Sequence, residues 1–518
     1  MDTELLHKLS LPALGETVLL LLAATILFFF TQAIYNAFIH PLHSIPGPKL
    51  NAISRLPYIF HHLDGTAPFY LRKLHEQYGD VVRYSISEVS FISGDTSWTE
   101  IYGHRTGRLR GHPTLEKDPA WYAPPIEGVQ SLLFEPDEPH HRRRRAWVHS
   151  FSDKCLAQQF STVQSVSDQL IEQLKEDGKG VADLSSYLSW TMFDIVSTLI
   201  YGQPLGCLSN RATHKNAVMI QNGMKAFRFL YVLWCWPIIK HLTGYLIDKK
   251  QIQEWIDHDK WLNAQTWARV ARGPSDGKKD FLSFVIRQDK SDKENSVASG
   301  KKDTWVTDEE LHVDSGLFLT AGTDTTAHAL STSIFLLCQH PEYMEKLKEE
   351  VRGRFTQYED ITPTQTNDMP YVSAVIFESL RLYAPTAVGF GRRVGKGGEL
   401  ISNCFIAEGT GVQVSQYPNN RSARNFAEPD SFRPERWLGD ERFASDKKDA
   451  FQPFSTGARN CLGKTLAQSE MRLIMSKLFW TFDFELDESI GTDWLEKSLW
   501  KMTWVKDPLR VYCKIVER

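Results

Sequence analysis

The chain has 518 residues and a formal net charge of −4, so no excess of positive charge marks it as a nucleic-acid-binding protein. Its seven cysteines show no CxxC spacing, which argues against a disulfide framework and favours a reducing compartment. No linker-like stretch divides the sequence, so we expect one large domain behind an N-terminal segment.

The N-terminal region contains an apolar stretch, "VLLLLAATILFFFTQAIYNAFI", that is long enough to cross a bilayer. A cleaved signal peptide is the competing interpretation. It is disfavoured because the preceding residues carry Asp2, Glu4 and Glu16 against one lysine, Lys8, and no small-x-small cleavage site follows cleanly. Lys49 and Arg55 follow the stretch and place the rest of the chain in the cytosol. We therefore predict a lumenal segment (1–17), a transmembrane anchor (18–39), a proline-rich elbow (40–50) and one cytosolic domain (51–518).

Helix-period segments dominate the domain up to about residue 385, with short strand-like runs such as "DVVRYSI" and "VQVSQY". This pattern predicts a mainly α fold with minor β. The polar run 287–303 lacks apolar periodicity and is expected to be a surface loop. The apolar run 227–239 is too short to span a membrane. It is either a buried core helix or a segment that dips into the bilayer surface.

A long helix is expected to begin at the capping box formed by Thr307 and Glu310 and to end before Pro341. Its middle, "AGTDTT" (321–326), consists mostly of weak helix formers. Gly322 would leave space beside the helix, and Thr325 would bond a backbone carbonyl or divert a hydrogen bond into a small cleft. A tolerated kink is the alternative.

A lone cysteine, Cys461, stands in "FSTGARNCLG", directly ahead of a segment with apolar residues on one helical face. At a helix N-terminus, exposed N–H groups and the helix dipole would favour the thiolate, which is a strong metal ligand. Gly457 permits a turn with positive φ, and Gly463 would let a flat group approach the backbone closely. A buried core thiol is the simpler alternative.

Phe454, Gly457, Arg459, Cys461 and Gly463 spell F-x-x-G-x-R-x-C-x-G, which resembles the haem-ligating loop of the cytochromes P-450. The resemblance implies the cytochrome P-450 fold, a triangular α-rich domain with small β-sheets. It also implies haem b as cofactor, with Cys461 as the axial ligand of the iron.

By the same resemblance, the "AGTDTT" helix forms the groove where oxygen binds beside the haem. Ala321 and Gly322 would line that groove. Asp324 and Thr325 would be the catalytic pair that relays protons towards the oxygen side of the haem.

The stretch "FESLRLYAP" places Glu378 and Arg381 one turn apart, a spacing that by itself is most often a surface ion pair. In the family this pair joins a later arginine in a buried structural network around the haem loop. Arg436 in "FRPERW" takes that place here.

Two further motifs resemble family contacts to the haem propionates. In "PHHRRRRAW", His140 stands where many members have tryptophan, and Arg144 is the expected arginine. In "GRRV", Arg393 matches better than Arg392. Arginine suits this role because its planar fork binds a carboxylate with two hydrogen bonds.

The resemblance covers essentially the whole chain, and "RNFAEPDSFRPERWLG" is similar to microsomal monooxygenases that tailor secondary metabolites in filamentous fungi. The implied function is oxidation of a lipophilic small molecule with O2 and NADPH-derived electrons at the endoplasmic reticulum membrane. Electrons would come from a membrane-bound NADPH–cytochrome P-450 reductase, with cytochrome b5 as a further donor. The basic run 142–145 would help to dock the reductase.

Three other functions stay open. A haem-thiolate isomerase or dehydratase would work without reductase, but such enzymes tend to lose the acid–alcohol pair that Asp324 and Thr325 represent. A xenobiotic or fatty-acid hydroxylase would use the same chemistry on another substrate. A non-catalytic haem sensor would need neither the groove nor a substrate cavity.

Overall fold

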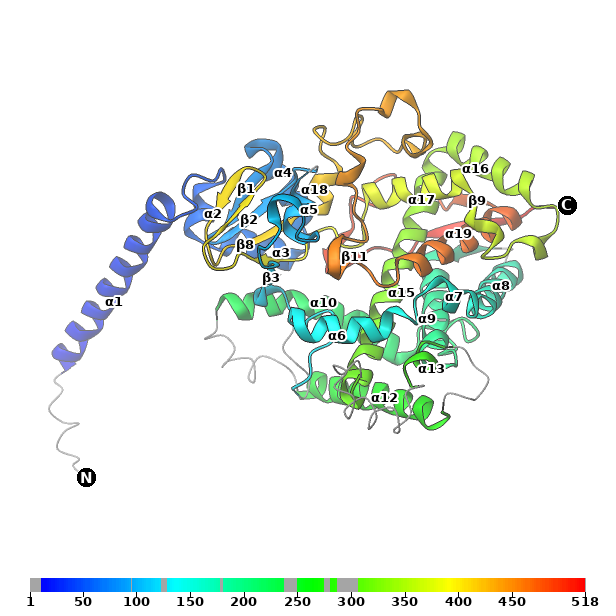
Figure 1. The fold of residues 1–518 in the computed structure, drawn as a ribbon, viewed down its shortest axis with the longest axis horizontal. Helices are drawn as coiled ribbons and strands as arrows, with labels where there is room; N and C mark the ends of the chain where they lie inside the picture. The colour runs from blue at the N-terminus through cyan, green and yellow to red at the C-terminus, as the bar shows by residue number, and fades with distance from the viewer. Residues whose placement is uncertain are drawn as a thin grey trace.

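The computed structural model describes residues 11–94, 96–122, 128–177, 180–236, 249–273, 280–286 and 306–517. These residues form a mainly helical body with small sheets, as Figure 1 shows, which confirms the expected fold class. The predicted loop at 287–303 lies outside the described residues.

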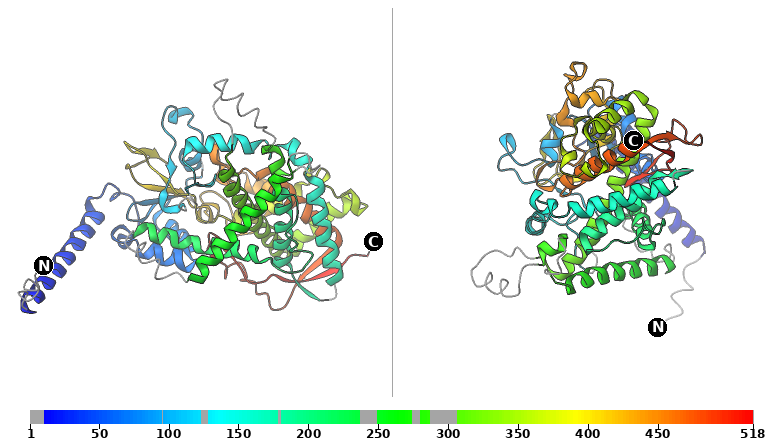
Figure 2. Two further views of the ribbon diagram at one scale, coloured as in Figure 1. Left: turned by 90° about the horizontal axis from the view of Figure 1, so that it is seen from below. Right: turned by 90° about the vertical axis from the view of Figure 1, so that its right-hand side faces the viewer.

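The N-terminal helix α1 (Leu11–Ile34) continues as one π-helical turn (Tyr35–Ile39) and projects away from the body in Figures 1 and 2. The stretch Gly15–Ile39 has a mean hydropathy of 2.2, and its large apolar side chains are exposed. The helix begins earlier than the predicted boundary at residue 18, because Pro12 suits a first helical turn. Residues 1–10 of the expected lumenal segment lie outside the described residues. This helix is a candidate membrane anchor.

The remaining helices are α2 (Lys49–Ile53), α3 (Leu56–Asp64), α4 (Ala67–Tyr78), α5 (Ser97–Tyr102), α6 (Asp137–Val148), α7 (Asp153–Ala157), α8 (Phe160–Asp177), α9 (Leu184–Tyr201), α10 (Lys215–Cys235), α12 (Lys249–Ala271), α13 (Phe281–Val285), α15 (Asp308–Gln339), α16 (Pro341–Arg354), α17 (Pro370–Leu382), α18 (Gln416–Asn420) and α19 (Lys464–Thr481). The strands are β1 (Val81–Ser85), β2 (Glu88–Phe91), β3 (Glu116–Lys117), β4 (Val181–Asp183), β5 (Arg392–Arg393), β6 (Glu399–Ile401), β7 (Cys404–Ile406), β8 (Gly411–Val414), β9 (Phe482–Leu486), β10 (Leu499–Lys501), β11 (Thr503–Val505) and β12 (Arg510–Ile515).

The largest sheet joins segments that are far apart in the sequence, in the order β1-β2-β8-β5-β3. Strand β2 pairs with β8 in parallel, and the other pairs are antiparallel. The strand-like run "VQVSQY" forms only β8 and is followed at once by α18. Pro418 helps to end the strand, because proline cannot donate a hydrogen bond to a strand ladder. The sheet thus brings β5 next to the segment that precedes α6.

Helix α15 is the central element of the helical body and packs against α9, α12, α17 and α19. It begins where the sequence predicts: the Thr307 side chain accepts from the Glu310 N–H, and the Glu310 carboxylate accepts from the Thr307 N–H at 2.8 Å. It ends at Gln339, just before Pro341 starts α16. With 32 residues it is about 48 Å long at the standard helical rise, so it crosses the body.

Candidate functional site

The cysteine loop runs from Phe454 to Gly463 and is closed by a hydrogen bond from the Cys461 N–H to the Phe454 carbonyl, at 2.9 Å. Gly457 has a φ of +77°, and a Cβ there would lie 2.0 Å from the Tyr102 carbonyl oxygen of α5. Only glycine fits this approach. At Gly463, a Cβ would meet no described atom closer than 3.9 Å, so the face of the loop on that side is open.

Cys461 lies three residues before α19, so it precedes the N-terminus of this helix as expected. Cys461 is exposed, and its neighbours in the loop are half-buried. Burial raises the pKa of the Cys461 thiol, whereas the Gly463 N–H and the charges of Arg144 and Lys464 lower it. The protein alone therefore does not favour the thiolate as the helix-dipole argument predicted.

Arg144 lies behind the cysteine loop. Its guanidinium donates to the Asn460 carbonyl at 2.8 Å and to the Asn460 side chain. Its charge also acts on Cys461. The structure thus gives Arg144 a role in fixing the residue next to the cysteine, and the propionate contact that the sequence suggested stays a prediction.

A group of cations lies beside the cysteine loop: Arg459, Arg392, Lys117 and His140. Arg459 donates to Asp137 at 2.8 Å, while its Nη1 has no partner among the described residues. Burial lowers the pKa of Lys117 well below its usual value, and the charges of Arg459 and Arg392 lower it further. Burial, followed by the charges of Arg459 and Lys117, lowers the pKa of His140 to about 3. The charged forms of Lys117 and His140 are therefore disfavoured, and the positive charge of the group rests on Arg459 and Arg392, of which Arg459 already pairs with Asp137.

A pocket of about 230 Å³ adjoins these cations, with Tyr102, Leu115, Asp137, Arg392 and Arg459 among its lining residues. Arg392 is buried, and its Nε has no partner within the described part of the chain. Buried cationic donors without acceptors are costly unless an anion joins them. The pocket and its donors fit a ligand that carries carboxylates.

The sequence preferred Arg393 over its neighbour, but the strand β5 turns the two side chains to opposite faces. Arg393 donates to the buried Asp118 at 2.5 Å and to the Gly409 carbonyl at 2.6 Å. It is therefore engaged elsewhere, and Arg392 is the side chain that joins the cation group. The sequence alone did not point to Lys117, and it favoured Arg393 over Arg392. Strand alternation at "GRRV" places the two side chains on opposite faces, but the sequence does not say which face meets the site.

Ala321, in the middle of α15, is exposed although the helix packs against several others. We call the open space beside Ala321 the hollow. The Thr325 hydroxyl donates to the Ala321 carbonyl at 2.7 Å, as expected for a threonine that bonds back along its helix. Asp324 is half-buried, and its charge acts on Lys506.

Gly322 does not open towards this hollow in the way the sequence suggested. A Cβ at this position would lie 3.1 Å from the Val196 side chain of α9. The glycine therefore serves close packing between two helices, and the space beside Ala321 does not depend on it.

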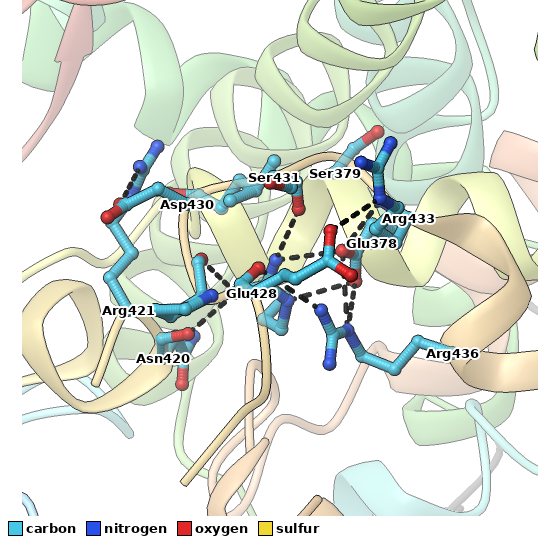
Figure 3. Close-up of polar contacts among 12 residues, drawn as sticks. Glu378, Ser379, Asn420, Arg421, Glu428, Asp430, Ser431, Arg433 and Arg436 are labelled. Carbon is cyan, nitrogen blue, oxygen red and sulfur yellow. Dashed lines mark hydrogen bonds and ion pairs between the residues drawn. The ribbon is translucent and has the colours of Figure 1, made fainter. Parts of the chain in front are cut away.

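Glu378, Arg381 and Arg436 form the network that the family pattern implies, and all three side chains are fully buried (Figure 3). Arg381 donates to Glu378 at 2.7 and 2.9 Å, and Arg436 lies 3.3 Å from the same carboxylate. Two more donors, the Arg433 N–H and the Trp437 indole, complete the shell at 3.0 Å each. This is a buried network, and not the surface ion pair that the spacing alone suggests.

The basic run 142–145 is mostly turned inward. Arg143 is fully buried and pairs with Asp314 of α15, whose carboxylate also accepts from the Trp147 indole at 2.8 Å. Arg142 pairs with Glu310. Arg145 is exposed, so the run offers less positive surface for a partner than its sequence suggests.

The apolar run 227–239 docks its Tyr231 inside the protein. Tyr231 is 1% exposed, and its hydroxyl donates to Glu88 at 2.5 Å. The burial of Tyr231 favours a buried core helix over a segment that dips into the bilayer surface. Residues 237–239 lie outside the described residues.

Comparisons with known proteins agree with this geometry. The family model described as Cytochrome P450 matches residues 50–511. Cytochrome P450 monooxygenase traB of Penicillium crustosum is 44% identical over 494 residues, which cover 94% of each chain. Cytochrome P450 monooxygenase lcsI of Purpureocillium lilacinum is 36% identical, covering 96% of this chain and 94% of its own. Cytochrome P450 monooxygenase atr2 of Stereocaulon alpinum is 34% identical, covering 100% and 99%. This chain therefore belongs to the cytochrome P450 family of monooxygenases.

Proposed function

We propose that this protein is a membrane-anchored haem-thiolate monooxygenase that oxidises a lipophilic small molecule in fungal secondary-metabolite biosynthesis. The observation that carries the proposal is a pair of arginines beside the cysteine loop with unsatisfied donors. Arg392 Nε and Arg459 Nη1 are buried atoms with no partner in the described part of the chain. Two propionates of a haem would supply the missing carboxylates.

The residues present fit haem b. Cys461 would bind the iron, and the loop of Phe454, Gly457 and Gly463 would lie against one face of the ring, where a Cβ at Gly463 meets only open space. Arg459, Arg392, His140 and Lys117 would hold the propionates, with Arg392 in place of Arg393. Ala321 would border the other face. Bound there, haem supplies the activation of O2 and the insertion of one oxygen atom into the substrate.

On the α15 side, the chain provides groups that hold and move protons. The Thr325 hydroxyl donates a hydrogen bond to the Ala321 carbonyl, so its oxygen can still accept a hydrogen bond from a group in the hollow. Asp324, next in the chain, is an acid that exchanges protons with the interior. Together they form a relay from the protein interior to the hollow.

The electrons are proposed to come from NADPH through a membrane-bound NADPH–cytochrome P-450 reductase, with cytochrome b5 as a further donor. The apolar helix α1, followed by Lys49 and Arg55, supports a single-pass anchor with the catalytic domain on the cytosolic side of the endoplasmic reticulum. The likeness to fungal monooxygenases supports secondary metabolism as the setting.

The test is the carbon monoxide difference spectrum of membranes that express the full chain, recorded as reduced protein with carbon monoxide minus reduced protein without it. A strongly red-shifted Soret band in the native protein, lost in Cys461→Ser, is the expected result. A band that survives this substitution would show that another residue binds the iron. NADPH oxidation that requires added reductase separates a monooxygenase from a reductase-independent isomerase.

A further inference from the structure

The C-terminal end of α1 is fixed to the body of the protein by a buried arginine. Arg83 of β1 donates to the Asn36 carbonyl of the π-helical turn at 2.9 Å and, through two nitrogens, to the Ile86 carbonyl at 3.1 and 2.6 Å. Arg83 is 2% exposed, and no carboxylate pairs with it in the described part of the chain. The last carbonyls of a helix lack partners within the helix, and a cation suits the negative end of the helix dipole. Arg83 therefore joins the end of the apolar helix to the sheet.

The elbow that follows α1 is held by the same strand. The Arg83 N–H donates to the Pro46 carbonyl at 2.7 Å, and a Cβ on Gly47 would lie 2.2 Å from the Arg83 carbonyl oxygen. Only glycine allows this close approach. Leu42 is fully buried and belongs to the same apolar cluster as Val89 of β2. The elbow is therefore packed on the sheet and is not a loose tether between α1 and the body.

Large apolar side chains are exposed beside this junction, on three consecutive elements. We call them the junction face, and they are between 58% and 66% exposed: Phe38 and Ile39 of the π-helical turn, Leu50 of α2, and Leu56 and Phe60 of α3. The turn packs against α2, and α2 packs against α3. In Figure 1, α1 joins the body beside α2. Single exposed apolar residues are ordinary, whereas a contiguous group marks a binding surface.

The charge of this region suits the surface of a membrane. Residues 17–63 contain no aspartate or glutamate, and Lys49, which directly precedes Leu50, is exposed. The Lys49 ammonium donates to the Ala37 carbonyl at 3.5 Å and lies 5.5 Å from the centre of the Phe38 ring. It therefore stands at the end of the apolar helix. Lipid headgroups attract such basic groups, and exposed apolar side chains insert below the headgroups.

We propose that the junction face rests in the lipid leaflet from which α1 emerges, and that Arg83 is the positioning residue that holds it there. The inference rests on the proposed function, because it requires α1 to span the membrane. A lipid bilayer is the occupant because the face begins within the apolar stretch Gly15–Ile39 itself, at Phe38 and Ile39. Since α1 and the elbow are both fixed to the sheet, the body meets the leaflet in one orientation.

The experiment uses the full chain in nanodiscs of phosphatidylcholine and phosphatidylserine that also contain a diazirine-labelled phosphatidylcholine. After illumination and trypsin digestion, mass spectrometry measures the yield of lipid adducts on each peptide. Peptides 50–55 and 56–72 should carry many more adducts than peptides 146–154 and 437–442, which contain Val148 and Leu438, two exposed apolar residues away from the junction. Equal adduct yields on the two pairs of peptides would overturn the inference.

Two variants test the face and its support separately. Leu56→Ser combined with Phe60→Ser should lower the adduct yield on the neighbouring peptide 50–55 about tenfold, as expected when two large apolar side chains are no longer buried in lipid. Leu438→Ser is the control and should leave this yield unchanged. An unchanged yield in the double variant would show that the face does not lie in the leaflet.

Arg83→Met should lower the adduct yield on peptide 50–55 while the yield on peptide 9–49, which contains α1, stays as in the native protein. Arg424→Met, at an arginine that is 64% exposed, is the matched control. If Arg83→Met does not fold, Arg83→Lys should still lower the yield, because lysine keeps the charge but lacks the planar fork that reaches both carbonyls. A native yield in the folded variant would remove Arg83 from the proposal.

Failure of this inference can be told apart from failure of the proposed function. The carbon monoxide spectrum first establishes that each variant is folded and binds haem through the cysteine. If peptide 9–49 of the native protein carries no adducts, α1 does not lie in the bilayer and the anchor of the proposed function is wrong. If peptide 9–49 carries adducts but peptides 50–55 and 56–72 do not, the anchor stands and only the junction face is wrong.

Discussion

The network around Glu378 gives the strongest prediction for stability. The Glu378 carboxylate accepts from Arg381, Arg436, the Arg433 N–H and the Trp437 indole, and it is fully buried. Glu378→Gln keeps the shape but removes the negative charge, so Arg381 is left buried beside an uncharged amide. Removing one partner of a buried ion pair destabilises a protein by about 3–5 kcal/mol. We expect a loss of this size.

The control is Glu76→Gln, which breaks an i,i+4 pair with Arg72 at a carboxylate that is 61% exposed. An exposed pair contributes about 0.2–1 kcal/mol, so this variant should unfold almost like the native protein. Urea unfolding of the full chain in detergent, followed by tryptophan fluorescence and by the haem absorption, gives the free energy of unfolding. A Glu378→Gln loss no larger than that of Glu76→Gln would refute the reasoning.

Three further outcomes are expected. Asp314→Asn should also lower the free energy of unfolding by about 3–5 kcal/mol, since it leaves the fully buried Arg143 without this counter-charge; urea unfolding checks it. Arg392→Gln should speed haem loss to a haem-scavenging protein about tenfold, as expected for losing a charged hydrogen bond of roughly 1.5–3 kcal/mol. Arg393→Gln should not speed haem loss, because Arg393 pairs with Asp118. Equal rates of haem loss in the two variants would contradict the assignment of Arg392 to the propionates. Thr325→Ala should keep the carbon monoxide band and release more hydrogen peroxide, which a peroxidase-coupled assay measures.

Local patterns predicted the elements that depend on neighbours in the chain. The capping box at Thr307 and Glu310 fixed the start of α15 to the residue, because both hydrogen bonds are made within one turn. The positive φ at Gly457 was also predicted, because glycine adopts this conformation without strain in a tight turn. The sequence also identified the cysteine loop, because five residues at fixed spacing define its motif.

Contacts across the fold were harder to predict. The sequence could not separate Arg392 from Arg393, because which face of β5 meets the cation group depends on how the sheet packs on the body. The run 142–145 was expected to offer basic surface, but Arg143 is buried and pairs with Asp314, which is 171 residues later in the sequence. A single helix periodicity does not reveal that partner.

The sequence by itself determined the apolar length of α1, the mainly helical fold and the cysteine that would bind the iron, because these depend on composition and on short spacings. The tertiary structure decided which basic side chains surround the pocket, that Glu378 is buried, and that Arg143 pairs with Asp314 of α15. Charges on distant segments interact strongly only when folding brings them close together and removes the water between them. The distance between two such charges is set by the packing of the whole chain.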